Sequence, residues 1–167
     1  MSGRRYTACQ ARDSSASPSE IFALLSDSST YPDWSSVSGY EMERPGFAAP
    51  HGVGEIRVLK SWPFRVREEI VELVPDRFMA YTLLSGLPMR DYRGETTLDP
   101  LPDGGTRVTW RSNFSGVLGT GGFMRLFMMW VLSNLTSSLV QGAEARVSSK
   151  STPVAPQQRI TPGSMPS

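Results

Sequence analysis

The sequence has a single cysteine, Cys9, and a single histidine, His51. One cysteine excludes a disulfide within the chain and any metal site built from several cysteines. A catalytic triad or a multi-histidine metal site would need His51 itself, and its Pro-His-Gly context favours an exposed loop instead. No acidic cluster takes the place of the missing ligands, so we expect no metal site and no cofactor.

An excess of charge of either sign is also missing. The 167 residues include seventeen Lys and Arg against sixteen Asp and Glu. Proteins that bind nucleic acids, or membranes through a polybasic patch, show a marked excess of positive charge, so the composition indicates neither partner. Arginine outnumbers lysine fifteen to two, but the arginines are spread along the chain and indicate no anion site.

Long hydrophobic runs are absent as well. The first residues, Met-Ser-Gly-Arg-Arg-Tyr-Thr, lack the apolar core of a signal peptide, so a cytoplasmic location is expected. The longest apolar stretch, Phe123 to Leu132, has ten residues against the ~20 that cross a bilayer, and no transmembrane segment is predicted. The glycines between 116 and 122 precede this stretch without the Lys-Ser/Thr of a phosphate loop, which favours a hinge.

A long helix is the strongest positive signal. No proline occurs between Gly121 and Lys150, so one helix of roughly 40 Å is allowed. From Phe123 to Leu132 only Arg125 is polar, which predicts a helix covered on every side. Farther on, the apolar residues share one helical stripe, which predicts that the second half lies on a flat surface. The stripe is Leu132, Leu135, Leu139, Ala143 and Val147.

The N-terminal part reads as a strand and two short helices. Tyr6 to Arg12 is compatible with an edge strand. Ser17-Pro18-Ser19-Glu20 predicts a helix start, with Ser17 as N-cap, Pro18 in the first turn and Glu20 closing a capping box. Thr30 to Trp34 allows a second, very short helical turn.

The middle of the chain reads as six strands joined by short turns, which predicts an antiparallel meander. The predicted strands are Gly39 to Arg44, Gly54 to Ser61, Phe64 to Val74, Phe78 to Ser85, Arg90 to Asp99 and Thr106 to Ser115. Residues 150–167 are mostly Ser, Thr, Pro, Gln and Gly, which is typical of disorder. We therefore expect one domain over residues 1–149 and a disordered tail over 150–167.

Alternation along the strands predicts which side chains face inward. Val108, Trp110 and Phe114 share one face of their strand, and Arg90 and Tyr92 share the inward face of the strand before it. The strand from Phe64 has two possible registers. We favour the one that turns Phe64, Val66, Glu68, Ile70 and Glu72 inward over the alternative with Arg65, Arg67, Glu69, Val71 and Leu73.

The order of elements and three stretches of sequence resemble the START-like, pollen-allergen-like superfamily, and within it the polyketide cyclase/dehydrase group. The stretches are Ser17 to Asp27 with Tyr31-Pro32-Asp33-Trp34, Arg67 to Arg77, and Gly104 to Trp110. The resemblance implies an α+β helix-grip fold: a curved antiparallel sheet of about seven strands wrapped around one long C-terminal helix, with two short helices after the first strand. It also implies a deep, mostly apolar cavity between sheet and helix.

The polar residues on inward registers are the candidates for chemistry. Cyclase chemistry, as the resemblance implies it, needs a donor to stabilise an enolate, for which Arg90 or Tyr92 is suited, and a group to move a proton, for which Glu68 is suited. Each of the three also has a purely structural interpretation: Arg90 as a solvated residue, Tyr92 as a core residue and Glu68 as the partner of a neighbouring arginine. The candidates for cavity lining are Trp34, Trp110, Phe114, Phe127 and Trp130.

Two functions follow from these expectations. The first is binding of a hydrophobic, polyketide-like or aromatic small molecule, with its cyclisation or dehydration. The second is a non-catalytic carrier or sensor of a lipid-like ligand. The sequence does not decide between them, and it leaves the oligomeric state, a homodimer included, open.

Overall fold

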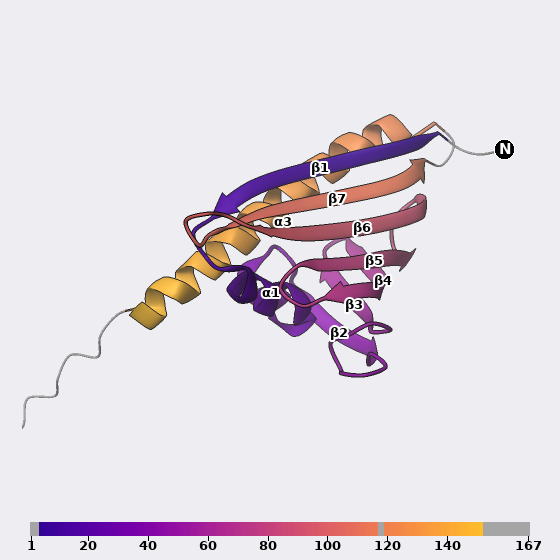
Figure 1. Ribbon diagram of the computed structural model, residues 1–167. Helices are drawn as coiled ribbons and strands as arrows, with labels where there is room; N and C mark the ends of the chain where they lie inside the picture. Colours follow the sequence, from indigo (N-terminus) through magenta and orange to yellow (C-terminus); the bar gives the residue numbers. More distant parts are fainter. Residues whose placement is uncertain (1–3, 117–118, 152–167) are drawn as a thin grey trace, which may run out of the picture.

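One curved antiparallel sheet and one long helix form the body of the protein. The structure, a computed structural model, describes residues 4–116 and 119–151. The seven strands lie in the order β1-β7-β6-β5-β4-β3-β2, and α3 crosses their concave side with α1 packed beside it (Figure 1). The elements are β1 (Arg5–Ser14), α1 (Pro18–Ser26), the 3-10 turn η1 (Ser28–Thr30), α2 (Tyr31–Trp34), β2 (Gly39–Arg44), β3 (Ile56–Ser61), β4 (Phe64–Val74), β5 (Phe78–Ser85), β6 (Met89–Pro100), β7 (Thr106–Gly116) and α3 (Gly121–Ser151).

This architecture confirms the predicted helix-grip fold. The six predicted meander strands are β2 to β7, and β1 lies at one edge of the sheet, paired with β7. The helix start at Ser17 is also as predicted: the Glu20 carboxylate accepts hydrogen bonds from the Ser17 backbone N–H at 3.0 Å and from its hydroxyl at 2.8 Å. Local sequence signals therefore set most element boundaries.

Helix α3 buries one side along the sheet and exposes the other. Leu132, Leu139 and Ala143 are fully buried, and Leu135 and Val147 pack against the same core, so the predicted stripe is confirmed. The prediction that the first half is covered on every side is wrong. Phe123, Leu126 and Trp130 are 72%, 64% and 66% exposed, because the sheet covers only the opposite side of these turns.

The length of α3 raises the question of a membrane span. By length and composition alone this helix is able to cross a bilayer. Its contacts are those of a core helix, since it packs along β1, β7 and α1 and supplies much of the hydrophobic core.

The predicted domain ends at residue 149, but α3 continues to Ser151 and so includes the first two residues of the predicted tail. Residues 152–167 lie outside the described residues.

The favoured register of β4 holds for its first half only. Val66 and Ile70 point inward with Glu68. A register shift between Ile70 and Glu72 then exchanges the faces on which the following side chains lie. Leu73 therefore packs on the core, and Glu72 pairs with Arg93 at 2.8 Å. The prediction that Glu72 faces inward is wrong, because one additional residue at a bulge exchanges the two faces.

A second bulge corrects the placement of Arg90. The pairing of β6 with β7 shifts between Arg90 and Arg93, and Asp91 has a positive φ of 50°. Tyr92 is buried as predicted, whereas Arg90 is exposed. Strict alternation placed the two on one face, and the bulge puts Met89 in the core instead of Arg90.

Candidate functional site

A cavity of about 350 Å³ lies between the concave side of the sheet and the first half of α3. This volume is within the ~300–1,000 Å³ typical of small-molecule sites. Strands β3 to β6 form one wall, α3 the other, and the segment after α2 closes a side. The lining is mostly apolar, with Val37, Leu59, Val66, Leu87, Met128 and Leu132 among its residues.

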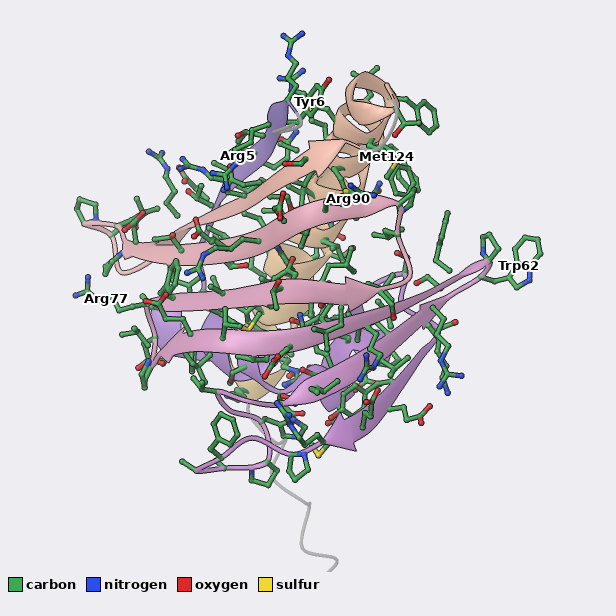
Figure 2. The ribbon with its side chains drawn as sticks, turned by 90° about the vertical axis from the view of Figure 1, so that its right-hand side faces the viewer. Arg5, Tyr6, Trp62, Arg77, Arg90 and Met124 are labelled. Carbon is green, nitrogen blue, oxygen red and sulfur yellow. The ribbon has the colours of Figure 1, made fainter. Side chains whose placement is uncertain are left out.

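The cavity opens at one end of the sheet. Trp62, at the tip of the β3–β4 hairpin, is 94% exposed and projects beyond the strands (Figure 2). Phe64 of the hairpin lies 5.8 Å from Phe127 of α3, centroid to centroid, and Phe127 lies 6.3 Å from Trp130. These aromatic side chains belong to the cavity lining and form its outer edge.

Polar groups gather at the inner end of the cavity. Glu68 lines the cavity, and the Arg57 guanidinium lies behind it, only 1% exposed. Arg57 donates to Glu68 Oε2 from Nε at 3.0 Å and from Nη2 at 2.9 Å. A buried charge without partners would destabilise the fold by several kcal/mol, so this pairing is what lets either group remain inside.

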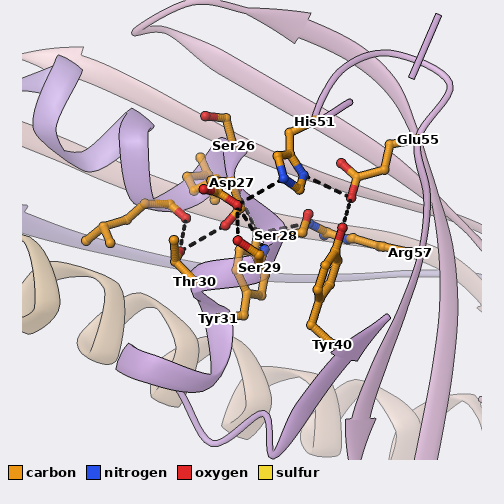
Figure 3. A network of polar contacts seen from close by, with 12 residues as sticks. Ser26, Asp27, Ser28, Ser29, Thr30, Tyr31, Tyr40, His51, Glu55 and Arg57 are labelled. Atoms are coloured by element: carbon orange, nitrogen blue, oxygen red, sulfur yellow. Dashed lines mark hydrogen bonds and ion pairs between the residues drawn. The ribbon is translucent and has the colours of Figure 1, made fainter. Parts of the chain in front are cut away.

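Arg57 is satisfied on its remaining sides by the short helical segments. Its Nη1 donates to the hydroxyls of Ser28 and Tyr31, both at 3.0 Å, and these contacts join β3 to η1 and α2 (Figure 3). The guanidinium also lies over the rings of Tyr31 and Tyr81, 4.9 and 5.0 Å from their centroids. Arg57 is therefore a fixed element of the wall that holds Glu68 in place.

Two tyrosines complete the inner end. The Tyr81 hydroxyl accepts a hydrogen bond from the indole N–H of Trp110 at 2.9 Å, and the hydroxyls of Tyr92 and Ser112 lie 2.8 Å apart. The two tyrosine rings are 6.0 Å apart. The Tyr81 ring lies on Gly94, where a Cβ would come within 2.3 Å of the ring, so the strand needs glycine here.

Burial governs the protonation of these groups. It raises the pKa of Glu68, against which the charge and hydrogen bonds of Arg57 act. Burial also raises the pKa of Tyr92 to about 12, and Glu68 adds to this shift. The pKa of Tyr81 is raised well above its ordinary value by burial and by Tyr92. At neutral pH the tyrosines are neutral donors, and Glu68 holds a proton to higher pH than an exposed carboxyl does.

The sequence identified part of this site. Glu68 and Tyr92 line the cavity as predicted, and so do Phe127 and Trp130. Arg90 is absent from the lining because of the bulge described above. The roles of Glu68 and Tyr92 in chemistry stay predictions.

Three predicted lining residues lie elsewhere. Trp110 is buried behind Tyr81, to which it is hydrogen-bonded. Phe114 stacks on Tyr6 with a centroid distance of 5.9 Å. Trp34 packs edge-on against Tyr31 at 4.7 Å. Inward facing was therefore inferred correctly for Trp110 and Phe114, but the core beneath the cavity and its wall are not the same set of residues.

Arg57 and Tyr81 were missed. A signal for Arg57 was present, because the two residues between β3 and β4 place Ser61 opposite Phe64 and hence Arg57 opposite Glu68. A cross-strand pair of opposite charges on an inward register would have indicated a buried ion pair. Tyr81 shares the inward face of β5 with Met79 and Leu83, as alternation predicts, but alternation does not tell which inward residues reach the cavity.

A second polar cluster lies outside the cavity. His51 is half-buried in the β2–β3 loop, with Nε2 3.2 Å from Asp27 Oδ1 and Nδ1 3.4 Å from Glu55 Oε1 (Figure 3). The Tyr40 hydroxyl donates to the same Glu55 oxygen at 2.9 Å. Within residues 4–116 and 119–151, no three His, Cys, Asp or Glu side chains are arranged to hold a metal ion. This cluster ties the loop to η1.

Comparison with known proteins gives a family and a fold. Residues 7–144 match a family described as polyketide cyclase / dehydrase and lipid transport. A START superfamily protein from Mycobacterium smegmatis superposes with a TM-score of 0.71 at 14% identity, covering 87% of this chain and 99% of that one. A Thalictrum norcoclaurine synthase mutant in complex with a transition-state analogue gives 0.71 at 12% identity, covering 88% and 99%.

A third structure, the protein XoxI from Bacillus cereus, gives a TM-score of 0.69 at 16% identity, covering 81% of this chain and 94% of that one. No curated protein matches the sequence. At these identities the structural matches show the fold alone.

Proposed function

The chain belongs to the polyketide cyclase / dehydrase and lipid transport family, and we propose that it binds a hydrophobic, polyketide-like or aromatic small molecule in the cavity under α3. The observation that carries the proposal is the composition of the cavity: apolar walls with Glu68, Tyr81 and Tyr92 together at the inner end. Such a site encloses a flat apolar molecule and fixes its orientation through one oxygen-bearing end.

We further propose that the inner end cyclises and dehydrates the bound molecule. The Tyr92 hydroxyl donates to a ligand carbonyl oxygen and stabilises the enolate that forms when Glu68 takes a proton from the adjacent carbon. The enolate carbon attacks a second carbonyl, forming the C–C bond. Glu68 returns its proton to the alkoxide oxygen that this attack creates, which gives a hydroxyl. For the dehydration, Glu68 takes the remaining proton of the same carbon and passes it to that hydroxyl, which leaves as water as the C=C bond forms. The raised pKa of Glu68 supports this role, because a carboxyl that both takes and returns a proton needs a higher pKa than an exposed one.

A carrier or sensor of a lipid-like ligand is the second candidate. The observation that favours it is the apolar mouth, because exposed aromatic side chains there suit the uptake and release of a lipid-like ligand more than the exclusion of water from an enolate. A carrier would use Glu68 and Tyr92 only to orient the ligand. Both candidates share the cavity and the cytoplasmic location expected above, which stays a prediction.

Native mass spectrometry of the freshly purified protein tests the binding proposal, because a molecule held in the cavity is detected as an added mass. A cavity-filling variant, Val66→Trp, is expected to lose that mass. Val71→Trp is the matched control, since Val71 lies on the same strand outside the cavity lining and is partly exposed. An apolar ligand that remains bound to both variants would overturn this placement.

A further inference from the structure

We propose that the mouth end of the protein docks onto the surface of an anionic lipid membrane. The docking surface is a set of exposed apolar side chains, here called the apolar rim: Trp62, Phe64, Phe123, Leu126 and Trp130. This inference goes beyond ligand binding, because it concerns where the protein is when the cavity fills or empties.

The apolar rim holds most of the exposed large apolar surface of the described residues. Trp62 is 94% exposed at a hairpin tip, and Phe123, Leu126 and Trp130 lie three or four residues apart on one side of α3. Among the described residues, Phe47 is the one other large apolar side chain more than half exposed. Exposed apolar surface gathered in one place marks an interaction site.

Three residues of the apolar rim lie at the mouth of the cavity. Trp62, Phe64 and Trp130 are at once exposed and part of the cavity lining. A partner that covered the apolar rim would therefore cover the opening as well. If that partner is the hydrocarbon edge of a bilayer, an apolar ligand passes between membrane and cavity without crossing water.

The charges around the mouth fit an anionic surface. The strand ends at this end of the sheet and the first turns of α3 carry six basic residues, Arg4, Arg5, Lys60, Arg65, Arg90 and Arg125. They carry two acidic residues, Glu41 and Asp91, and Glu41 already pairs with both Lys60 and Arg65. The near-zero net charge of the chain hides this asymmetry, which Figure 2 shows in part through Arg90 and Trp62 at the same end.

A membrane fits these features better than a protein partner. Tryptophan is enriched at membrane–water interfaces, where its ring is amphipathic like the interface itself. A helix side with Trp, Phe and Leu, flanked by arginine, has the composition of interfacial helices that bind anionic lipids. The Trp62 hairpin projects as a wedge from the sheet, which suits insertion into a fluid layer more than contact with a flat protein surface.

Vesicle sedimentation tests the proposal. The full chain is mixed with vesicles of phosphatidylcholine alone or with a quarter phosphatidylglycerol, and the bound fraction is measured at low and high salt. Binding is expected with phosphatidylglycerol and is expected to weaken with salt, because part of the attraction is electrostatic. No sedimentation with either vesicle overturns the proposal.

Paired variants locate the surface. Trp62→Ser with Phe123→Ser should weaken vesicle binding by at least about tenfold, since two inserted side chains are lost. Phe47→Ser, at an exposed aromatic outside the apolar rim, should leave it unchanged. Arg90→Glu should weaken binding severalfold, whereas Arg77→Glu, at the opposite end of the sheet, should not (Figure 2). Equal losses in a variant and its control would overturn the placement.

Two further readouts separate docking from self-association. Tryptophan emission should shift to the blue on adding anionic vesicles, and less so in Trp62→Phe, which keeps an apolar side chain at the tip. Sedimentation velocity reports the oligomeric state without lipid. A dimer that the Trp62→Ser, Phe123→Ser variant abolishes, with no vesicle binding by the parent protein, would make the apolar rim a homodimer interface and overturn the membrane proposal.

Discussion

Arg57 donates two hydrogen bonds, from Nε and Nη2, to a single oxygen of Glu68, Oε2. Among the described residues, no group donates a hydrogen bond to the other oxygen, Oε1. Because Glu68 lines the cavity, this leaves one carboxylate oxygen for a ligand while the charge of the group is balanced from behind. We infer that the pair separates two tasks, with Oε2 held by the wall and Oε1 available to a ligand.

The buried pair should respond differently to single and double replacement. Arg57→Met leaves Glu68 buried without its partner and should lower the free energy of unfolding by about 3–5 kcal/mol. Adding Glu68→Met should recover much of this loss, since no charge then remains inside. The measurement is urea denaturation of the two variants. Arg65→Met, which breaks the exposed pair with Glu41 on the same hairpin, is the control and should lose less than about 1 kcal/mol.

Conservative changes at Glu68 and Tyr92 should distinguish an enzyme from a carrier. Tyr92→Phe and Glu68→Gln keep the shape of the cavity, so an enzyme should keep ligand affinity within severalfold while turnover falls about 10²- to 10⁴-fold. A carrier should instead lose affinity worth about 1–3 kcal/mol through an unpaired polar group. A fluorescence titration beside a product assay on the co-purified molecule measures both quantities. Unchanged turnover in both variants would remove these residues from the mechanism.

The buried stripe of α3 should be sensitive to truncation. Leu139→Ala removes a fully buried side chain and should lower the free energy of unfolding by about 2–5 kcal/mol. Leu126→Ala, on the same helix but 64% exposed, should change it by less than about 0.5 kcal/mol. Chemical denaturation of the two variants makes the comparison, and similar losses would contradict the orientation of the helix.

Alkaline conditions should destabilise the fold. The pKa of Tyr92 is about 12 in the folded protein because of burial, against an ordinary value of 10.0. The unfolded chain therefore releases this proton first, and stability falls as pH rises from about 10 to 12. At pH 11 the loss from Tyr92 alone is about 1 kcal/mol. The loss between pH 8 and pH 11 should be smaller in Tyr92→Phe by this amount, as measured by urea denaturation at both values.

Local sequence patterns predicted the helices and strands. Features that depend on contacts between distant parts of the chain were not predicted. Capping at Ser17 and the apolar stripe through Leu139 act over one or two helical turns, so the sequence alone showed them. The facing of Arg90 and Glu72 depended on bulges, which one-residue shifts create and alternation does not detect. The exposure of Trp130 depended on how far the sheet extends along α3, which no local pattern encodes.

Arg57 and Tyr81 were missed for the same reason, because their roles in the site depend on contacts between strands. Glu68 was identified from its own strand, but its partner lies eleven residues earlier, across a hairpin. Tyr81 lies opposite Gly94 of the neighbouring strand, which leaves room for its ring. Residues whose role depends on two or more strands at once are those that single-strand reasoning does not find.

The contact between Gly94 and Tyr81 has a consequence for how ligand preference can change over evolution. A side chain at position 94 would collide with the Tyr81 ring, which lines the cavity and accepts a hydrogen bond from Trp110, so the shape of the wall depends on a residue outside the lining. The space available to a ligand therefore depends in part on the backbone behind the wall. A relative with alanine at this position would have to hold the Tyr81 ring differently, and is expected to prefer ligands of another shape even if every residue touching the ligand were identical.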